Sequence, residues 1–231
     1  VTFLFTSFTF VQGSNSLKSI DVDKFRGIRV NGNYQVFLKQ GSTQSVKIEG
    51  EEKEVNAMST KVENGIWSIQ NRSKNGKSQC NSYSNSYNSK SPMKIYITMS
   101  DLDYISLSSS GKVSTENTFN VDNIDLKLTG SGKMRLSLNA KSIESSLCGS
   151  GKLALKGSAK HMESRITGSG DIDAEDMSVE NVNISVTGSG DAQIHATSYL
   201  KAKVSGSGDI YYKGSPSLHK SVSGSGSVSK I

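Results

Sequence analysis

The chain has 231 residues, of which 34% are hydrophobic, and its 27 basic and 21 acidic residues give a formal net charge of +6. This length allows one domain or two small ones, and a content of only 2 prolines argues against a disordered chain. The basic residues are scattered singly and do not alternate with aromatic residues, so the composition argues against nucleic-acid binding.

The first 19 residues differ in composition from the rest. Residues 1–11 read VTFLFTSFTFV, an apolar segment that is too short to cross a bilayer as a helix. Small residues at Val11 and Gly13 fit a cleavage site before Ser14. We therefore expect residues 1–19 to be a signal-peptide remnant and linker, which implies export; a first β-strand is the alternative. The sequence contains no other candidate membrane span.

Residues 20–100 predict short, irregular β-coils that cap the chain's repetitive part. Strands are expected at 28–30, 34–38 and 46–48, and alternating apolar residues predict another at 93–99. The Asn64-Gly65 pair predicts a hairpin between Val62 and Trp67. Residues 73–91 are low-complexity and polar, which indicates a long surface loop. This loop contains Cys80; it and Cys148 fit no zinc or redox spacing, and whether they pair stays open.

Residues 101–231 contain a serial Gly-Ser-Gly repeat, with a degenerate first copy at 109–111. Successive closing glycines are 18 to 21 residues apart. We expect each triplet to be a tight turn, because glycine adopts positive φ and allows close backbone approach. The turn glycines are Gly130, Gly132, Gly149, Gly151, Gly168, Gly170, Gly188, Gly190, Gly206, Gly208, Gly224 and Gly226.

Apolar residues recur at fixed places around each turn, with the period of two that is typical of a strand. The position two before the turn is Leu, Ile or Val in every copy from Leu107 to Val222, and the position two after it is apolar from Val113 to Val228. The pattern predicts an all-β fold, a single-stranded right-handed parallel β-helix of the pectin-lyase-like kind with about 19 residues per coil. Residues 20–231 would then form one continuous domain.

The glycine-rich turns do not predict nucleotide or calcium binding. A phosphate loop needs a following helix, whereas a strand follows each copy here. A calcium-binding β-roll needs two glycine turns per coil, and this chain has one. The histidines at 161, 195 and 219 occupy different places in their coils and fit no ligand set. We therefore expect no metal and no cofactor.

The position directly after the turn changes from Lys in three copies to Asp in the next three. Asp171, Asp191 and Asp209 would stack in one outward column, with Asp173 on the same face. This acidic column is the candidate binding site; a solvated face without a ligand is the alternative. Grouped carboxylates also occur in polysaccharide-cleaving β-helices, but the coils here lack the insertions that would wall a groove. We therefore predict no catalytic residues and no enzyme, with a polysaccharide-active enzyme as the alternative.

The segments FRGIRVNGNYQVFLKQG and MKIYITMSDLDYISLSSSGKV and the copies LTGSGK, ITGSGD, VTGSGD and VSGSGD resemble the head-GIN-domain auto-transporter adhesins of Gram-negative bacteria. The resemblance covers residues 25–231. It implies an exported β-helix that is periplasmic, outer-membrane-associated or secreted, and that binds a surface ligand, glycan or protein. A homo-oligomer and an envelope scaffold or sensor stay open.

Overall fold

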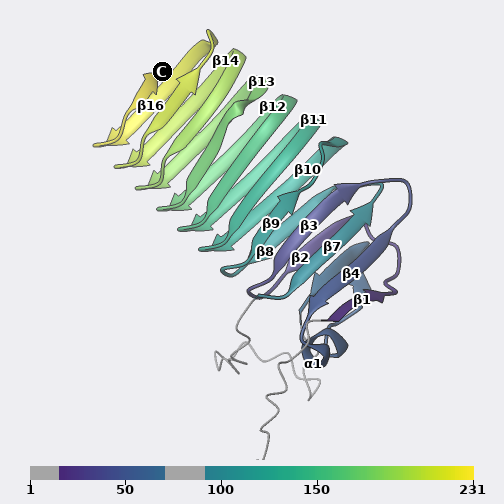
Figure 1. Ribbon diagram of the computed structural model, residues 1–231. Coiled ribbons are helices and arrows are strands. Elements are labelled where there is room, and N and C mark those ends of the chain that lie inside the picture. The colour runs from purple at the N-terminus through teal and green to yellow at the C-terminus, as the bar shows by residue number, and fades with distance from the viewer. Residues whose placement is uncertain (1–15, 71–91) are drawn as a thin grey trace, which may run out of the picture.

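The computed structural model describes residues 16–70 and 92–231, which form one continuous β-sheet coiled about a single axis (Figure 1). Residues 1–13, Cys80 and the loop 73–91, on which the sequence makes predictions, lie outside the described residues. The elements within them are β1 (Ser16–Ile20), β2 (Gly27–Val30), β3 (Gln35–Gln40), β4 (Ser45–Gly50), α1 (Glu52–Asn56), β5 (Val62–Glu63), β6 (Ile66–Ile69), β7 (Lys94–Met99), β8 (Tyr104–Ser108), β9 (Lys112–Thr115), β10 (Phe119–Gly130), β11 (Lys133–Gly149), β12 (Lys152–Gly168), β13 (Asp171–Gly188), β14 (Ala192–Gly206), β15 (Ile210–Lys213), β16 (Ser217–Gly224) and β17 (Val228–Lys230).

Successive coils stack in parallel register. Lys133 of β11 pairs with Lys152 of β12, which in turn pairs with Asp171 of β13. The chain therefore returns to the same place in the sheet after about 19 residues, and it makes about 7 turns. This confirms the β-solenoid that the spacing of the turns predicts.

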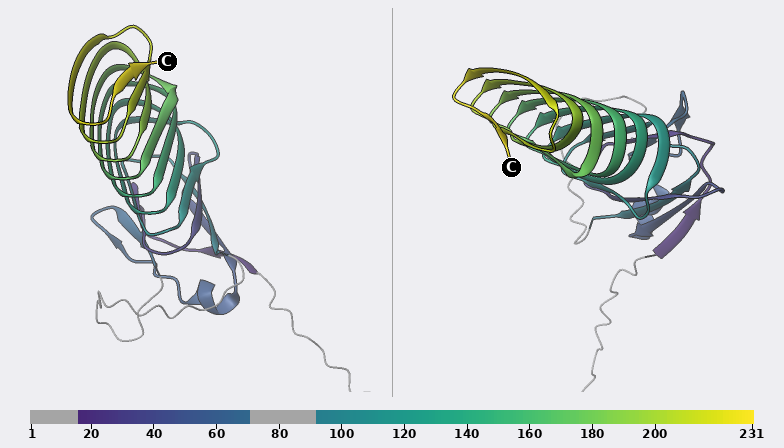
Figure 2. Two further views of the ribbon diagram at one scale, coloured as in Figure 1. Left: turned by 90° about the vertical axis from the view of Figure 1, so that its left-hand side faces the viewer. Right: turned by 90° about the horizontal axis from the view of Figure 1, so that it is seen from above.

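Each coil has two walls, and the coils appear as stacked ovals when they are seen nearly end-on (Figure 2). The chain passes through wall 1 directly after each turn and through wall 2 directly before it. Wall 1 consists, in order, of β1, β4, β7, β3, β9, the first parts of β11 to β14, β15 and β17. Wall 2 consists of β6, β2, β8, the second parts of β10 to β14, and β16. Because side chains alternate along a strand, each wall has an inward and an outward face.

The inward faces of the two walls bury the apolar columns that the repeat predicts. The column before the turn is buried from Leu107 to Val204, and the column after it from Val113 to Val228. Burial of each such Val, Leu or Ile stabilises the fold by about 1.5–3 kcal/mol. The exception is Val222, which is 41% exposed, because its strand β16 pairs with β14 on one side and has no described coil on the other.

The Gly-Ser-Gly turns need their two glycines for different reasons. Gly168 has a φ of 117°, which side chains with a Cβ rarely adopt. A Cβ on Gly170 would lie 2.7 Å from the carbonyl oxygen of Gly151 in the preceding coil. The N–H of Ser169 donates to the carbonyl of Gly149 at 2.9 Å, so the turn backbone itself joins consecutive coils.

The N-terminal part adds elements that depart from the parallel stack. β1 and β7 both pair with β4 in antiparallel orientation. The predicted hairpin is confirmed as β5 and β6, with Asn64 and Gly65 at φ values of 52° and 75°. The sequence pattern does not predict α1, since five residues are too few to show a helical period. Its one buried residue is Val55. The acidic residues in its first turn stabilise the helix, because negative charge interacts favourably with the positive end of the helix dipole.

Candidate functional site

The outward face of wall 1 carries the residues that follow each turn, stacked one above another. We call this line of residues the turn row. It is basic in three coils and acidic in the next three, and all of its members before Ser227 are exposed or half-buried charged residues. In order, the turn row is Lys112, Lys133, Lys152, Asp171, Asp191, Asp209 and Ser227.

The carboxylates of the acidic half accept backbone N–H groups of the next coil. Asp191 Oδ1 accepts the N–H of Asp209 at 2.8 Å, and Asp209 Oδ1 accepts the N–H of Ser227 at 2.7 Å. The contact from the Asp191 N–H to Asp171 Oδ1 is longer, at 3.4 Å. Because a charged acceptor strengthens such bonds, these side chains connect consecutive coils as well as facing solvent.

The change from Lys to Asp also changes how the turn is hydrogen-bonded. The N–H groups of Lys152 and Asp171 donate to the carbonyls of Gly132 and Gly151, both at 3.0 Å. From Asp191 onward the carboxylate of the preceding coil takes the acceptor position instead. The acidic side chains therefore replace an acceptor that the backbone supplies in the basic half.

The fourth predicted carboxylate, Asp173, lies on the same face, and its Oδ2 is 3.7 Å from Lys152 Nζ. A hollow of about 110 Å³ lies among Lys152, Asp171, Asp173 and Asp191. Within residues 16–70 and 92–231, no three His, Cys, Asp or Glu side chains are grouped to hold a metal ion. That this column binds a ligand remains a prediction.

A second row of outward side chains runs beside the turn row, two residues further along each strand. In order, it contains Tyr96, Phe37, Ser114, Arg135, Ala154, Asp173, Gln193 and Tyr211. The rings of Phe37 and Tyr96 stack with centroids 5.1 Å apart and planes 15° apart. Ser114 and Ala154 are shorter than their neighbours, and a hollow lies over each, of about 240 Å³ and 340 Å³ respectively.

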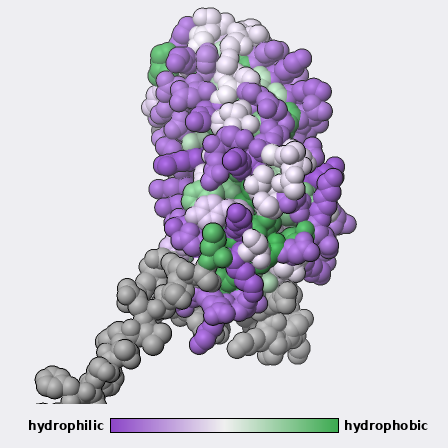
Figure 3. Space-filling view, turned by 45° about the vertical axis from the view of Figure 1, so that its right-hand side comes forward, coloured by the Kyte–Doolittle hydropathy of each residue, from purple (hydrophilic) through white to green (hydrophobic). Residues whose placement is uncertain are grey.

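We call the smaller of these hollows the cationic notch. The outward side chains in its lining are Gln35, Phe37, Lys112, Ser114, Lys133 and Arg135. The sequence pattern does not predict the notch, because Phe37 is far from the other residues along the chain and lies beside them only through the pairing of β3 with β9. Figure 3 shows a mainly hydrophilic surface in which hydrophobic patches gather toward the N-terminal coils.

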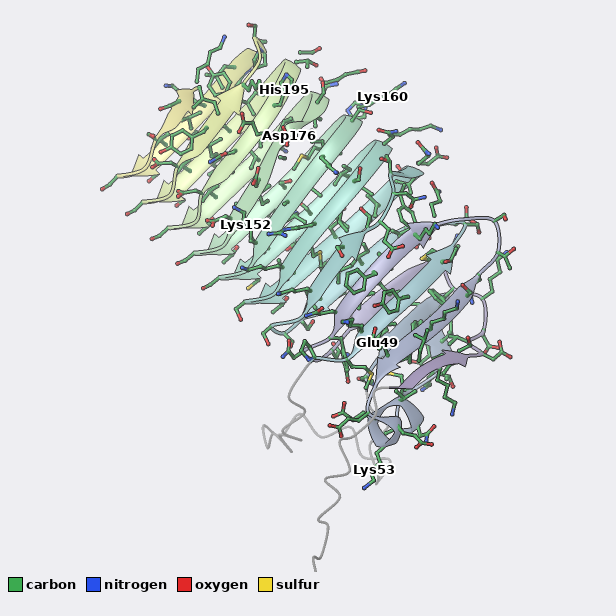
Figure 4. The ribbon with its side chains drawn as sticks, viewed as in Figure 1. Glu49, Lys53, Lys152, Lys160, Asp176 and His195 are labelled. Atoms are coloured by element: carbon green, nitrogen blue, oxygen red, sulfur yellow. The ribbon has the colours of Figure 1, made fainter. Side chains whose placement is uncertain are left out.

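Beyond the Phe37–Tyr96 stack, β4 and β7 carry a network of three side chains near the N-terminal end of wall 1. Glu49 accepts hydrogen bonds from Lys94 Nζ and from the Tyr96 hydroxyl, each at 3.0 Å. The bond from Lys94 has the largest effect on the pKa of Glu49, and both bonds lower it. The bond to Glu49 in turn raises the pKa of Lys94. Desolvation and then the bond to Glu49 raise the pKa of Tyr96. In Figure 4, Glu49 lies near one end of the molecule and Lys152 lies further along it.

Wall 2 carries a different pattern of charge. Two of its acidic side chains are paired with basic neighbours two residues away, Asp125 with Lys127 at 2.7 Å and Glu163 with Arg165. Cys148 is exposed on this wall, and its pairing with Cys80 falls outside the described residues. The described part of the chain has no helix long and apolar enough to cross a membrane.

The histidines do not meet in one site. His161 pairs in the sheet with Ser142 and Asn181, His195 with Ser178 and Lys213, and His219 with Lys201. The three side chains therefore belong to three different rows of the solenoid, as their places in the repeat indicate.

Comparison with known proteins supports the adhesin resemblance. The family described as "Putative auto-transporter adhesin, head GIN domain" matches residues 24–216. A putative adhesin from Bacteroides fragilis superposes with a TM-score of 0.82 at 26% identity, over 94% of this chain and 97% of that one. A putative adhesin from Parabacteroides distasonis gives 0.75 at 24% identity, over 95% and 98%.

A structure described as a putative lipid-binding protein, also from Parabacteroides distasonis, gives a TM-score of 0.72 at 22% identity, over 95% of this chain and 98% of that one. At this identity the similarity shows the fold alone. Among curated proteins, none matches the sequence. The family match covers most of the chain, and a solved relative matches it over nearly its whole length with the same coiled sheet. The chain belongs to the head-GIN-domain family of putative auto-transporter adhesins.

Proposed function

We propose that the protein is a non-enzymatic, exported binding protein that attaches to a surface ligand, glycan or protein, through the outward face of wall 1. The observation that supports this is the turn row, which places three Lys and then three Asp side chains at the regular strand spacing of about 4.8 Å. Such a face offers equivalent contacts to a repetitive ligand. Each contact is weak, but together they bind with avidity.

The family membership supports a role in adhesion, and the geometry of the acidic column supports a binding rather than a catalytic use. The Oδ1 atoms of Asp191 and Asp209 already accept backbone N–H groups at 2.8 and 2.7 Å. A carboxylate engaged in this way holds its position, whereas a general acid or base must exchange a proton with its substrate. Asp209 Oδ2 also accepts the Tyr211 hydroxyl at 3.3 Å, whereas Asp191 Oδ2 accepts no hydrogen bond within residues 16–70 and 92–231 and is left for a ligand.

A binding screen with an activity assay tests this function. Wild-type protein is applied to arrays of glycans, extracellular-matrix proteins and lipid vesicles, and the same glycans are assayed for released reducing ends. The matched variant is Asp171→Asn/Asp191→Asn/Asp209→Asn, because asparagine keeps an acceptor oxygen and removes the charge. Binding without cleavage supports the proposal. Cleavage that the variant abolishes would instead assign the protein to the polysaccharide-active enzymes.

Export is the second part of the proposal, with a periplasmic, outer-membrane-associated or secreted location. Fractionation of cells that express a tagged full-length protein, combined with protease applied to intact cells, tests it. Tag signal that is protected from protease and confined to the periplasm would favour an envelope scaffold or sensor. Signal in the cytoplasm alone would contradict export.

A further inference from the structure

The cationic notch combines a flat ring, a guanidinium group and a small floor. Phe37, Ser114 and Arg135 lie side by side on three adjacent strands, β3, β9 and β11. Phe37 and Arg135 are therefore about 10 Å apart at the backbone, twice the inter-strand spacing. The short Ser114 between them leaves a hollow of about 240 Å³. A six-membered ring fits between the two planar groups in this space.

The notch has an excess of positive charge that no neighbour neutralises. Within the described residues Lys112, Lys133 and Arg135 make no ion pair, and all three are exposed. Lys112 and Lys133 are paired across adjacent strands, and Arg135 is two residues from Lys133 on the same face. Three like charges at these separations repel one another, and an anionic group bound among them removes that cost. The guanidinium fork of Arg135 suits a carboxylate in particular.

A second hollow continues the notch along the axis of the solenoid. It has a volume of about 340 Å³, lies over Ala154, and shares Ser114 and Arg135 with the first hollow. The far side of this second hollow carries Asp173 and Asp176, its lining also includes Lys156, and Asp173 lies 3.7 Å from Lys152 Nζ. A ligand that extends across both hollows therefore meets cations first, and then a mixed surface that contains two carboxylates.

This sequence of charges favours one class of polymer over another. Single-stranded nucleic acid carries a charge at every unit, and its bases require successive aromatic platforms. The carboxylates of the second hollow would repel its phosphates, and on the notch side the face offers the single Phe37–Tyr96 stack. A polysaccharide with intermittent acidic sugars places a carboxylate in the notch and neutral hydroxyl groups over the acidic part, where carboxylates accept hydrogen bonds.

We propose that the cationic notch binds the carboxylate-bearing sugar of an acidic polysaccharide, with the sugar ring against Phe37 and its carboxylate at Arg135, Lys133 and Lys112. The chain of the polymer then runs along the solenoid axis across Ala154 toward the acidic half of the turn row. This site rests on the proposed function of wall 1 as a binding face and names its ligand class.

Binding of half-methyl-esterified polygalacturonate, in which acidic and neutral sugars are interspersed, tests the proposal when it is measured by titration calorimetry at low salt. The fully methyl-esterified polymer has the same backbone without the charge and serves as the matched ligand. We expect Lys133→Gln/Arg135→Gln to weaken polygalacturonate binding by about tenfold, or about 1.4 kcal/mol. The matched control Lys201→Gln/Lys203→Gln removes two charges at the same spacing from exposed positions of wall 2 and leaves binding unchanged.

A third variant, Ser114→Phe, fills the notch without changing its charge and is compatible with a strand. We expect it to lose polygalacturonate binding as well, and circular dichroism together with the thermal midpoint verifies that each variant is folded. Equal binding of the esterified polymer, or an unaffected Lys133→Gln/Arg135→Gln protein, would overturn the proposal.

Three other results would also overturn the inference, and they separate it from the proposed function. Tighter binding of a single-stranded oligonucleotide would assign the notch to nucleic acid. A concentration-dependent dimer that Lys133→Gln/Arg135→Gln abolishes would assign it to self-association. Binding of only neutral glycans or proteins, reduced by substitutions elsewhere on wall 1, would overturn the inference about the notch and leave the proposed function intact. In contrast, the absence of binding to every array component would contradict both the inference and the proposed function.

Discussion

Asp191 uses one carboxylate oxygen to accept the backbone N–H of Asp209, which lies directly above it in the next coil, at 2.8 Å. The residue that follows each turn is thus exposed to solvent and also part of the bonding between coils. A sequence can suggest a stacked acidic column, but the column's structural role depends on the orientation of the turn backbone. The acidic residues of wall 1 therefore have to be tested for stability and for binding separately.

Replacing Asp191 separates these two roles. Asp191→Ala removes the acceptor of the Asp209 N–H, and we expect a loss of about 1 kcal/mol in the free energy of unfolding. This loss is smaller than that for a buried hydrogen bond, because the site is exposed to solvent. Asp191→Asn keeps an acceptor and is expected to lose less. Urea denaturation measures both, with Asp173→Ala as the control, because its carboxylate accepts no backbone N–H within the described residues. Equal losses for Asp191→Ala and Asp191→Asn would show that charge, and not the acceptor, matters.

The opening glycine of a turn should tolerate substitution poorly. In Gly168→Ala the alanine would have to adopt a φ of 117°, and its Cβ would lie 2.6 Å from the carbonyl oxygen of Gly149. We expect a loss of at least about 1–3 kcal/mol in the free energy of unfolding from backbone strain. The neighbouring Ser169→Ala, at an exposed position of the same turn, is expected to stay within about 0.5 kcal/mol of wild type. Similar denaturation midpoints for the two variants would contradict this account of the turn.

Two serines inside the solenoid form a buried polar pair. Ser145 and Ser164 are each 1% exposed, and their hydroxyl oxygens lie 2.6 Å apart on adjacent coils. Ser164→Ala leaves the Ser145 hydroxyl without this partner, and we expect it to cost about 1–3 kcal/mol. The double variant Ser145→Ala/Ser164→Ala removes both polar groups and is expected to be closer to wild type than the sum of the single variants. A double-mutant cycle measures this coupling, and additive losses would show that the two hydroxyls act independently.

The repeat carried most of the information about the fold, because its period fixes both the coil length and the stacking. Any one coil is stabilised by the next through the same pairs, such as Ile143 on Met162, so local pattern and global structure agree. Val222 departs from its column for a reason outside the pattern. Its environment depends on which strands lie beside β16 and not on its own neighbours in sequence.

The candidate site could be predicted only in part. The acidic column lies at a fixed place in the repeat, so its members Asp171, Asp191 and Asp209 were found from spacing alone. Phe37 and Tyr96 belong to the N-terminal coils, where no repeat sets the register, and they stack only because β3 and β7 are adjacent. Pairings between distant irregular strands leave no periodic pattern in the sequence, so the cationic notch could be identified only from the structure.

The network around Glu49 should make stability depend on pH. The hydrogen bonds from Lys94 and Tyr96 lower the pKa of Glu49 from its ordinary value of 4.5, so the folded protein holds this carboxylate ionised more strongly than the unfolded chain does. Its contribution is therefore present above about pH 4.5 and is lost as the pH falls through the lowered pKa. We expect Glu49→Gln to reduce the thermal midpoint at neutral pH, and the difference from wild type to shrink in acid. Glu180→Gln makes the same chemical change at an exposed position that has no ion pair among the described residues, and it serves as the matched control. A Glu49→Gln difference that persists well below pH 4.5 would show that packing, and not the ionised carboxylate, stabilises this end of wall 1.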